Sequence, residues 1–523
     1  MCHREVSPTQ QPSHDDIFQQ TRTSACQLTN PFYLQLTFEE AMIAKNPNGN
    51  TAVIPLLINN ESSVTETIFD VTSPATGEVI DRCAGATVDD ANRAVAAAKA
   101  AFPGWSKTKP YDRRDILIRA ADIMLSRKEE LIRYQMEETG AGRMFVEKTF
   151  MLGVGFLKDF AARIPSIEGT VPSVSEDGEC AMVIKQPYGV VLGIAPWNAP
   201  YILGTRAVAL PLAAGNTTIL KGSELSPKCF WAIGDIYREA GLPAGCLNVL
   251  YHRPSDAAAV TNALIAHPAV RKINFTGSTT VGSIIASTAG KYTKPVLLEL
   301  GGKASAIVLD DANLEKAAMC CALGSFMHSG QICMSTERVI VQRSIADRFK
   351  QMMAEAVEKV FGKHGPALVL VAPAAVKKNK ELVEDALAKG ANLVYGDTAA
   401  IDLNNSSMRP VIVGDVAKNM DMYFTESFGP TVSLIVVDSE EDAVTLANDT
   451  EYGLTSAVFT GNLFRGLRVA KQIEAGAVHI NSLTVHDEPV LPHGGWKSSG
   501  YGRFGGTSGY DEWLQTKTIT WVE

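Results

Sequence analysis

The stretch GVVLGIAP at residues 189–196 opens a series of short apolar runs separated by helical segments. The later runs are NTTILKGS at 216–223, LNVLYH at 247–252, RKINFTGS at 271–278 and PVLLELGG at 295–302. Strand–helix–strand alternation with continuously apolar strands is typical of a parallel sheet covered by helices on both faces. The predicted fold class is therefore α/β with a doubly wound parallel sheet, and such sheets bind ligands at the carboxyl ends of their strands.

The rest of the chain is expected to form further parts around this sheet. Residues 66–170 and 188–300 make the first domain, and a second α/β stretch at 301–500 makes another. Residues 171–187 have the pattern of a hairpin, and residues 505–523 end in TKTITWVE, which alternates like an edge strand. An exposed edge needs a cover, so these two segments are predicted to form an oligomerisation element.

Residues 1–65 are rich in polar side chains and lack periodicity, so we interpret them as a loosely held extension. With 523 residues and a net charge of −9, the chain has no basic field that would hold a nucleic acid. The most apolar segment, 189–220, is interrupted by prolines and polar residues, and no membrane span is expected. Nine cysteines without a C-x-x-C pair predict free thiols, a cytoplasmic protein and no metal site.

Two strand ends carry residues suited to a dinucleotide. Lys221 ends one strand and is followed by Glu224, whose carboxylate could accept both ribose hydroxyls and repel a 2′-phosphate. In FTGSTTVG at 275–282, glycines precede a helix start whose N-terminus favours phosphate. Both could equally be ordinary loops. The G-x-G-x-x-G string at 500–505 lacks a following βαβ unit and is interpreted as a tight turn.

Three residues form the predicted reactive group. Cys333 lies on a glycine-flanked turn between a helix and a strand, where a thiol is accessible. Glu299 ends the apolar strand PVLLEL, and burial there predicts a carboxylate with a raised pKa that acts as a general base. Asn198 follows the strand at 189–195, where its amide could donate to an oxyanion or simply belong to a turn.

Taken together, these motifs show that the chain resembles aldehyde dehydrogenases of the NAD(P)-dependent superfamily. The matching motifs, in the expected order over residues 69–523, are PWN at 196–198, KGSE at 221–224, FTGSTTVG at 275–282, LELGGK at 298–303, GQIC at 330–333, ESFGP at 426–430 and a glycine-rich GGWKSSGYGRFGG near the end.

The resemblance implies a role for each matching residue. Cys333 would be the nucleophile that forms a thiohemiacetal and a thioester, Glu299 the base for hydrolysis and Asn198 an oxyanion donor. The domain at 66–170 and 188–300 would bind NAD, with NADP possible, and the part at 301–500 would be catalytic. The implied cofactor contacts are Trp197, Lys221, Glu224, Gly277, Ser278, Gly282, Glu426 and Phe428. The implied assembly is a homodimer or homotetramer.

The substrate is expected to be an aromatic aldehyde, because NAPYILGTRAVALPLAAGN and INSLTVHDEPVLPHGG resemble the salicylaldehyde, vanillin and benzaldehyde dehydrogenase branch. Arg206 would either line the substrate tunnel or be paired structurally, and Phe145 and Tyr201 are further pocket candidates, as is the His486-Asp487 loop. The alternatives are an aliphatic or secondary-metabolite aldehyde, or a thiol hydrolase that uses Cys333 with His328.

The sequence also departs from the family's pattern. Phe504 stands where many relatives carry a second acid, so no proton relay is expected through it. The segment 361–380 looks shorter than usual.

Overall fold

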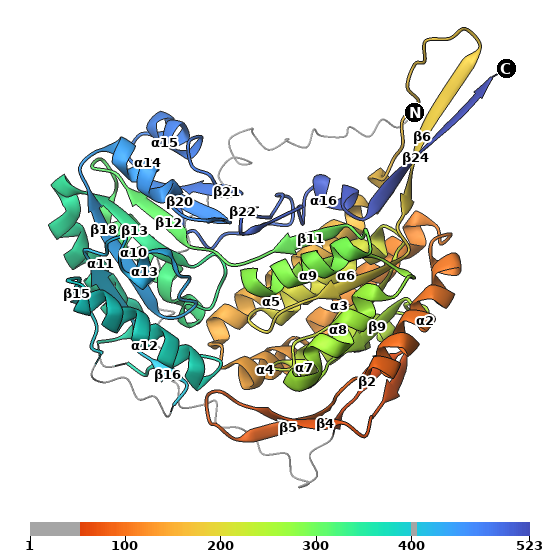
Figure 1. Cartoon of the computed structure of the whole chain (residues 1–523), viewed down its shortest axis with the longest axis horizontal. Helices are drawn as coiled ribbons and strands as arrows, with labels where there is room; N and C mark the ends of the chain where they lie inside the picture. The colour runs from red at the N-terminus through yellow and green to blue at the C-terminus, as the bar shows by residue number, and fades with distance from the viewer. Residues whose placement is uncertain (1–52, 364, 399–404, 523) are drawn as a thin grey trace, which may run out of the picture. The chain divides into compact units, whose positions relative to one another are not determined.

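An eight-stranded sheet dominates the first half of the chain in the computed structural model, which describes residues 53–363, 365–398 and 405–522 (Figure 1). Its order is β23-β11-β10-β7-β8-β9-β2-β3, and the five strands from β11 to β9 run parallel. The bounds are β23 Gly500–Tyr501, β11 Val296–Glu299, β10 Val270–Thr276, β7 Val190–Ile194, β8 Thr217–Lys221, β9 Leu247–Leu250, β2 Leu56–Ile58 and β3 Glu61–Ser63.

Helices cover both faces of this sheet, as the apolar strands require. Helices α2, α8 and α9 contact one another and the strands, and α6 and α7 pack together with α3, α4 and α5 stacked on them. The bounds are α2 Val88–Trp105, α3 Pro110–Ser126, α4 Lys128–Thr139, α5 Arg143–Arg163, α6 Pro200–Ala213, α7 Pro227–Glu239, α8 Ala257–Ala266 and α9 Thr279–Lys291. Every residue of β7, β8 and β9 is buried, which explains why their sequences do not alternate.

A seven-stranded sheet forms the second half, in the order β15-β17-β18-β13-β12-β20-β21. All pairs are parallel except β15 with β17. The strands are β15 Asn392–Tyr395, β17 Val411–Gly414, β18 Thr431–Val437, β13 Thr336–Gln342, β12 Ala304–Val308, β20 Thr455–Phe459 and β21 Ala477–Ile480. The helices are α10 Leu314–Phe326, α11 Ala346–Phe361, α12 Pro373–Ala388, α13 Asp421–Phe424, α14 Glu440–Asn448 and α15 Leu463–Ala470. The predicted α/β class with parallel sheets is confirmed.

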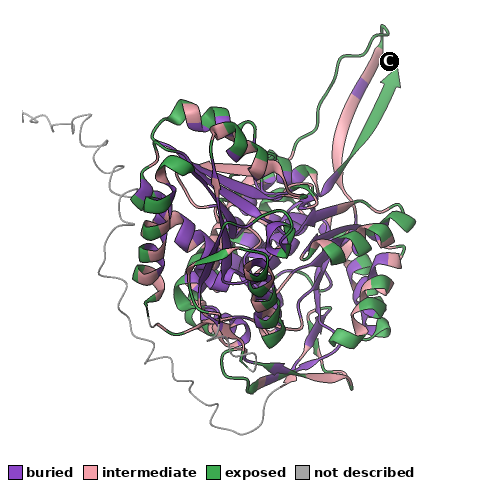
Figure 2. Cartoon of the chain, turned by 60° about the vertical axis from the view of Figure 1, so that its left-hand side comes forward, coloured by how far each residue is buried: buried purple, intermediate pink, exposed green. Residues whose placement is uncertain are grey.

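A long two-stranded ribbon joins the two segments that were expected to form one element. Strand β6, Glu179–Pro187, pairs antiparallel with β24, Leu514–Val522, along its whole length. The predicted hairpin within 171–187 was wrong, because only the bridge between Thr170 and Val183 links its arms and β6 takes β24 as its partner. The ribbon is largely exposed or half-buried (Figure 2).

The N-terminal boundary also differs from the expectation. Residues 53–63 form β1 Val53–Ile54, β2 and β3, and β2 adds to the large sheet beside β9. Leu56 and Leu57 are buried there, so the predicted extension to residue 65 was wrong at its end. Residues 1–52 lie outside the described part. Strand β1 pairs with β5 Val79–Ala84, which pairs with β4 Ile68–Thr72.

The remaining short elements connect these sheets. They are β14 Leu368–Val369 with β16 Ser407–Met408, β19 Tyr452–Gly453 with β22 Trp496–Lys497, α16 Ser508–Asp511 and the 3₁₀ turns η4 Ile164–Ser166, η5 Pro254–Asp256, η6 Met327–Gly330 and η7 Arg343–Ile345. In the segment expected to be short, α11 ends at Phe361 and α12 starts at Pro373. Among the described residues, no helix is both long and apolar enough to cross a membrane.

Candidate active site

Cys333 and Glu299 meet where the two sheets join. Glu299 is the last residue of β11, and Cys333 lies on the turn between η6 and β13. The Cys333 thiol donates to Glu299 Oε1 at 3.3 Å. Gly302 makes this approach possible, because a Cβ there would lie 2.3 Å from the Cys333 carbonyl oxygen. The thiol and the carboxylate, which the sequence placed in one reactive group, therefore lie within hydrogen-bonding distance of each other.

Charged partners surround the Glu299 carboxylate. Arg206 Nη1 lies 3.4 Å from Oε2, and His493 Nε2 lies 3.3 Å from Oε1. Burial would raise the pKa of Glu299, but the charges of His493 and Arg206 outweigh it and lower the pKa to about 2. The prediction that the pKa of Glu299 is raised was wrong. The sequence of β11 indicates that Glu299 is buried, but it does not reveal the cations that α6 and the 487–493 loop place beside it.

The pKa of the Cys333 thiol is shifted in the opposite direction. Burial and the negative charge of Glu299 raise the pKa of Cys333 well above its usual value. At neutral pH the pair therefore holds a thiol and a carboxylate. Attack by sulfur then requires transfer of the thiol proton, and Glu299 Oε1 is the acceptor already in contact with it.

Asn198 helps to fix the loop that carries the thiol. Its Nδ2 donates to the Gln331 carbonyl at 2.9 Å, and the Gln331 side chain accepts from Val371 N at 2.8 Å. Three successive residues, His328, Ser329 and Gly330, have positive φ angles. At Gly330 a Cβ would lie 2.1 Å from the Gly429 carbonyl oxygen, so only glycine fits.

A second loop faces the thiol from the seven-stranded sheet. Glu426 accepts from Gly302 N at 2.7 Å, and burial followed by the charge of Glu337 raises the pKa of Glu426 to about 7. Phe428 has φ of 47° and meets Trp197 edge to face at 6.1 Å. The predicted residues Trp197, Glu426 and Phe428 thus come from distant segments and lie around the same loop.

Glu337 anchors this second loop. It accepts hydrogen bonds from Ser427 N and Phe428 N, and the buried Lys303 lies 2.6 Å from it. Lys303 also donates to the Thr425 carbonyl at 2.8 Å. The buried pair therefore holds the backbone on both sides of Glu426.

The predicted cofactor residues lie at the carboxyl ends of neighbouring strands. Lys221 ends β8, with Nζ 4.0 Å from Glu224, and burial lowers the pKa of Lys221. Ser278 caps α9 by accepting from Val281 N, directly after β10. Strands β8 and β10 flank β7, so the two groups border the turn that carries Trp197.

Glycines at the start of α9 allow close packing of this turn. A Cβ on Gly282 would lie 2.4 Å from Leu300, and one on Gly277 would lie 2.4 Å from the Phe275 ring. The turn therefore cannot take a larger residue at either position without movement of its neighbours.

The three predicted substrate residues differ in their surroundings. Arg206 is paired with Glu299 and Asp487 and lies over the Phe156 ring. Phe145 stacks on His328 with 4.5 Å between ring centroids.

Tyr201 does not fit the prediction. It is fully buried in the core, and its hydroxyl donates to the Leu131 carbonyl. Tyr201 therefore contacts α4 and α5. It lies on α6, in which every residue is buried by other elements.

The sequence analysis missed His493 and Glu337, and it treated Asp487 only as a weak candidate. The sequence signal for His493 and Asp487 was a histidine and an acid in the polar stretch HDEPVLPHGG at 486–495. This stretch has no periodicity that would assign either residue to a helix or a strand. Glu337 had a stronger signal, because an acid that starts the apolar strand ERVIVQ must be paired when buried. No group of three or more metal-ligating side chains occurs in the described residues.

Comparisons with known proteins agree with this site. The model of the aldehyde dehydrogenase family matches residues 59–519. A vanillin dehydrogenase of a Pseudomonas species is 45% identical over 474 residues, covering 89% of this chain and 97% of that enzyme. A salicylaldehyde dehydrogenase of another Pseudomonas strain is 40% identical, with the same coverage.

A solved structure extends the agreement to three dimensions. The crystal structure of a salicylaldehyde dehydrogenase from Pseudomonas putida G7, complexed with salicylaldehyde, superposes with a TM-score of 0.87. It is 38% identical and covers 91% of this chain and 99% of that chain. Betaine aldehyde dehydrogenase of Staphylococcus aureus, in complex with NAD⁺, has a TM-score of 0.84 at 28% identity. The chain described here belongs to the aldehyde dehydrogenase family.

Proposed function

We propose that this protein oxidises an aromatic aldehyde to its carboxylic acid with NAD⁺, or NADP⁺, as the acceptor. The observation that carries the proposal is the contact between the Cys333 thiol and Glu299, held beside the strand ends that bear Lys221 and Ser278. Family membership supports the reaction class, and relatives named for vanillin and salicylaldehyde support the substrate class.

In the proposed first half-reaction, Glu299 accepts the Cys333 proton while sulfur attacks the aldehyde carbon. The S–C bond forms and the carbonyl π electrons move to oxygen. Asn198 lies at the neighbouring strand end and, with the Cys333 N–H, is the proposed donor to this oxyanion. Losing one such donor typically costs about 10²–10³ in rate.

The residues present fit a nicotinamide dinucleotide. A cation with a carboxylate at the end of β8 suits the adenosine ribose, and the capped N-terminus of α9 suits the pyrophosphate. Trp197 and Phe428 would border the nicotinamide, and Glu426 would bind its ribose. Bound NAD⁺ supplies the hydride acceptor that turns the thiohemiacetal into a thioester.

In the second half-reaction, Glu299 would take a proton from water while the water oxygen attacks the thioester carbon. The C–S bond breaks, sulfur regains a proton and the acid leaves. Cofactor-free hydrolysis of an ester would use the same two residues. His328, the alternative base, stacks on Phe145, while the thiol hydrogen-bonds to Glu299.

Aromatic selectivity is the part of the proposal that a direct measurement can test. We expect kcat/KM with NAD⁺ to be higher for vanillin, salicylaldehyde and benzaldehyde than for hexanal and betaine aldehyde. Phe145 and Arg206 are the proposed substrate contacts. A preference for the aliphatic or the cationic aldehyde would refute the aromatic assignment.

We also propose that the segments at 171–187 and 505–523 form a homodimer or homotetramer contact, while residues 66–170 with 188–300 bind the cofactor and residues 301–500 carry the nucleophile. The length of the β6–β24 ribbon and its exposed edge support an assembly role. A monomeric mass by light scattering at micromolar protein would refute it.

A further inference from the structure

A row of four side chains runs inward from the thiol. The Cys333 thiol contacts Glu299 Oε1, and the same oxygen lies 3.3 Å from His493 Nε2. The other ring nitrogen, Nδ1, lies 3.9 Å from Asp487 Oδ1. The exposed side-chain fractions of Glu299, His493 and Asp487 are 1%, 7% and 4%, so bulk water is excluded from this row.

The fold fixes His493 in this position from two directions. Its backbone forms an antiparallel bridge with Phe504, with N–O distances of 2.7 and 2.8 Å. The nearby strand β23 pairs with β11 through Glu299 and Gly500. The isolated bridge to Phe504 thus holds the backbone of His493 three residues after the strand that pairs with Glu299, and the Phe504 side chain offers no proton acceptor.

The charges around His493 favour a neutral imidazole that can accept a proton. Burial, then the charge of Arg206, lowers the pKa of His493, while Glu299 opposes this effect. Arg503 also faces the ring and lowers its pKa, and Asp487 faces Nδ1. From β21, the half-buried His479 also faces this group, and the charge of His493 contributes to lowering the pKa of His479.

The proposed reaction makes two demands on Glu299 in each cycle. It takes one proton from the Cys333 thiol before hydride leaves the substrate, and one from water before the thioester is hydrolysed. While His493 is neutral, the largest influence that lowers the pKa of Glu299 is absent, so a proton taken from the thiol can stay on the carboxyl. Unless that proton moves on, Glu299 is occupied when water has to be activated.

We propose that His493 takes the thiol-derived proton from Glu299 and thereby returns Glu299 to the carboxylate form for the hydrolytic step. The Oε1–H bond breaks as a bond forms from Nε2 to the same proton, and Asp487 faces the resulting imidazolium at Nδ1. The oxidation releases one proton per turnover, and transfer of this proton to solvent returns His493 to the neutral form. His493 acts through Glu299 in this proposal, so it is a positioning residue. The proposal rests on the proposed function.

The test is a comparison of burst and steady-state rates in His493→Gln. Glutamine can hydrogen-bond to Glu299 but cannot carry the proton. We expect a burst of about one NADH per active site to remain, because Glu299 can still accept once, while the steady rate falls about 100-fold, the lower end of the usual contribution of a proton-transfer group. The steady rate should recover as pH rises, because hydroxide removes the trapped proton.

p-Nitrophenyl acetate gives a second readout that needs neither aldehyde nor cofactor. It acylates Cys333 directly, so His493→Gln should again show a normal burst and slow deacylation. In His493→Ala, added imidazole should restore deacylation. The matched control is His267→Gln at the opposite end of β10, where His267 Nδ1 only accepts from Ala269 N.

The outcomes separate the two proposals. Burst and steady rate that fall together in His493→Gln, or a steady rate equal to that of wild type, would overturn the role of His493. A wild-type enzyme that forms no NADH from any aldehyde would overturn the proposed function, and the ester burst would still report on His493.

Discussion

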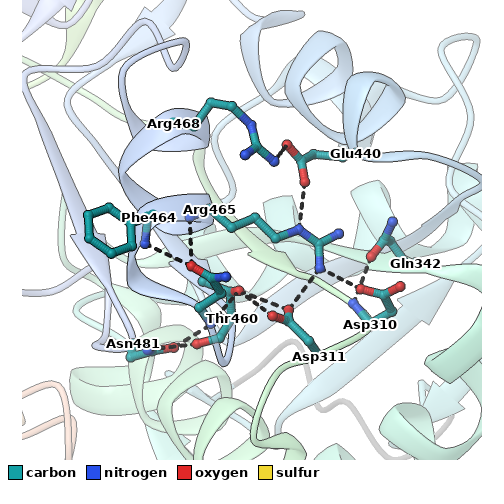
Figure 3. A network of polar contacts seen from close by, with 10 residues as sticks. Asp310, Asp311, Gln342, Glu440, Thr460, Phe464, Arg465, Arg468 and Asn481 are labelled. Carbon is teal, nitrogen blue, oxygen red and sulfur yellow. Dashed lines mark hydrogen bonds and ion pairs between the residues drawn. The ribbon is translucent and has the colours of Figure 1, made fainter.

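Two networks of ionic side chains in this molecule use the same residue types and have opposite surroundings. Around Glu299, the side chains of Arg206 and Asp487 are almost fully buried, with exposed fractions of 2% and 4%. Around Arg465 on α15, Asp310 is 51% exposed and Arg465 itself 21% (Figure 3). Arg465 nevertheless contacts Asp310, Asp311 and Glu440 at 2.6–2.9 Å.

The difference shows that exposure to water, more than the number of ion pairs, decides how strongly the charges of a network depend on one another. Burial is the largest single influence on both arginines: it lowers the pKa of Arg206, whereas at Arg465 the bonds to Glu440 and Asp310 and the nearby charges together outweigh it and raise the pKa. Water screens the Arg465 network, so its charges can be removed singly. The charges around Glu299 are balanced only by one another.

The largest expected effect follows removal of the charge on Glu299. Glu299→Gln should lower kcat by about 10²–10⁴, the contribution of a general base. Steady-state kinetics measures the loss. Glu440→Gln is the control, and a kcat close to that of wild type in Glu299→Gln would contradict the account.

Removing the buried cation Arg206 tests whether the charges around Glu299 balance one another. Arg206→Met should lower the free energy of unfolding by about 3–5 kcal/mol, because the Asp487 and Glu299 charges then have no cation between them. Urea denaturation measures the loss. The double variant with Asp487→Asn should recover part of it, and full additivity of the two changes would argue against a shared network.

The second buried pair should affect both stability and cofactor use. Glu337→Gln leaves the Lys303 charge unmatched and weakens the bonds to Ser427 N and Phe428 N, so we expect a loss of about 1.5–3 kcal/mol. The KM for NAD⁺ should rise more than the KM for the aldehyde, because the loop holds Glu426. An unchanged KM for NAD⁺ in a folded variant would separate the loop from the cofactor.

The free energy of unfolding at acidic pH should reveal the contribution of the Glu299 carboxylate. Its pKa is about 2 in the folded protein, against roughly 4.3 for an unperturbed glutamate, so its stabilisation is complete above the higher value. As pH falls toward 2, that contribution is lost. The stability advantage of wild type over Glu299→Gln should therefore shrink across this window in urea titrations, and a constant difference would show that the carboxylate is not stabilised by its neighbours.

The smallest effect is expected on the exposed network. Arg465→Met should cost only about 1 kcal/mol, with the loss decreasing further in high salt, and should leave kcat unchanged. Thermal unfolding at low and high ionic strength tests both statements. A loss comparable to that of Arg206→Met would remove the distinction between the two networks.

Much of the fold could be predicted because its strands are buried on both faces. The continuously apolar runs of β7 and β8 identify a parallel sheet by themselves. Strands β1, β2 and β3 were not predicted because each has only two or three residues, which is too short for a hydrophobic periodicity to appear. The segments of the ribbon were assigned to one element, but the pairing of β6 with β24 was not predicted, because the two strands lie more than three hundred residues apart.

The site divides in the same way. Glu299 and Asn198 follow strands of the same parallel sheet, so their shared edge could be predicted, whereas Cys333 precedes β13 of the other sheet and topology alone does not bring it to Glu299. Arg206 stayed ambiguous because α6 is buried on all sides and its sequence marks no face. His493 lies in an irregular segment, where only the bridge to Phe504 decides which way the residue faces.

The pairing of β23 with β11 has a consequence for how this chain is synthesised. The ribosome delivers Cys333 long before Gly500, so the nucleophile leaves the exit tunnel while Glu299 still lacks its outer neighbour strand and His493 is not yet made. Closing so distant a contact is slow. The charged cluster around Glu299 can therefore form only after residue 501 has been made, when the other strands of both sheets have already been synthesised.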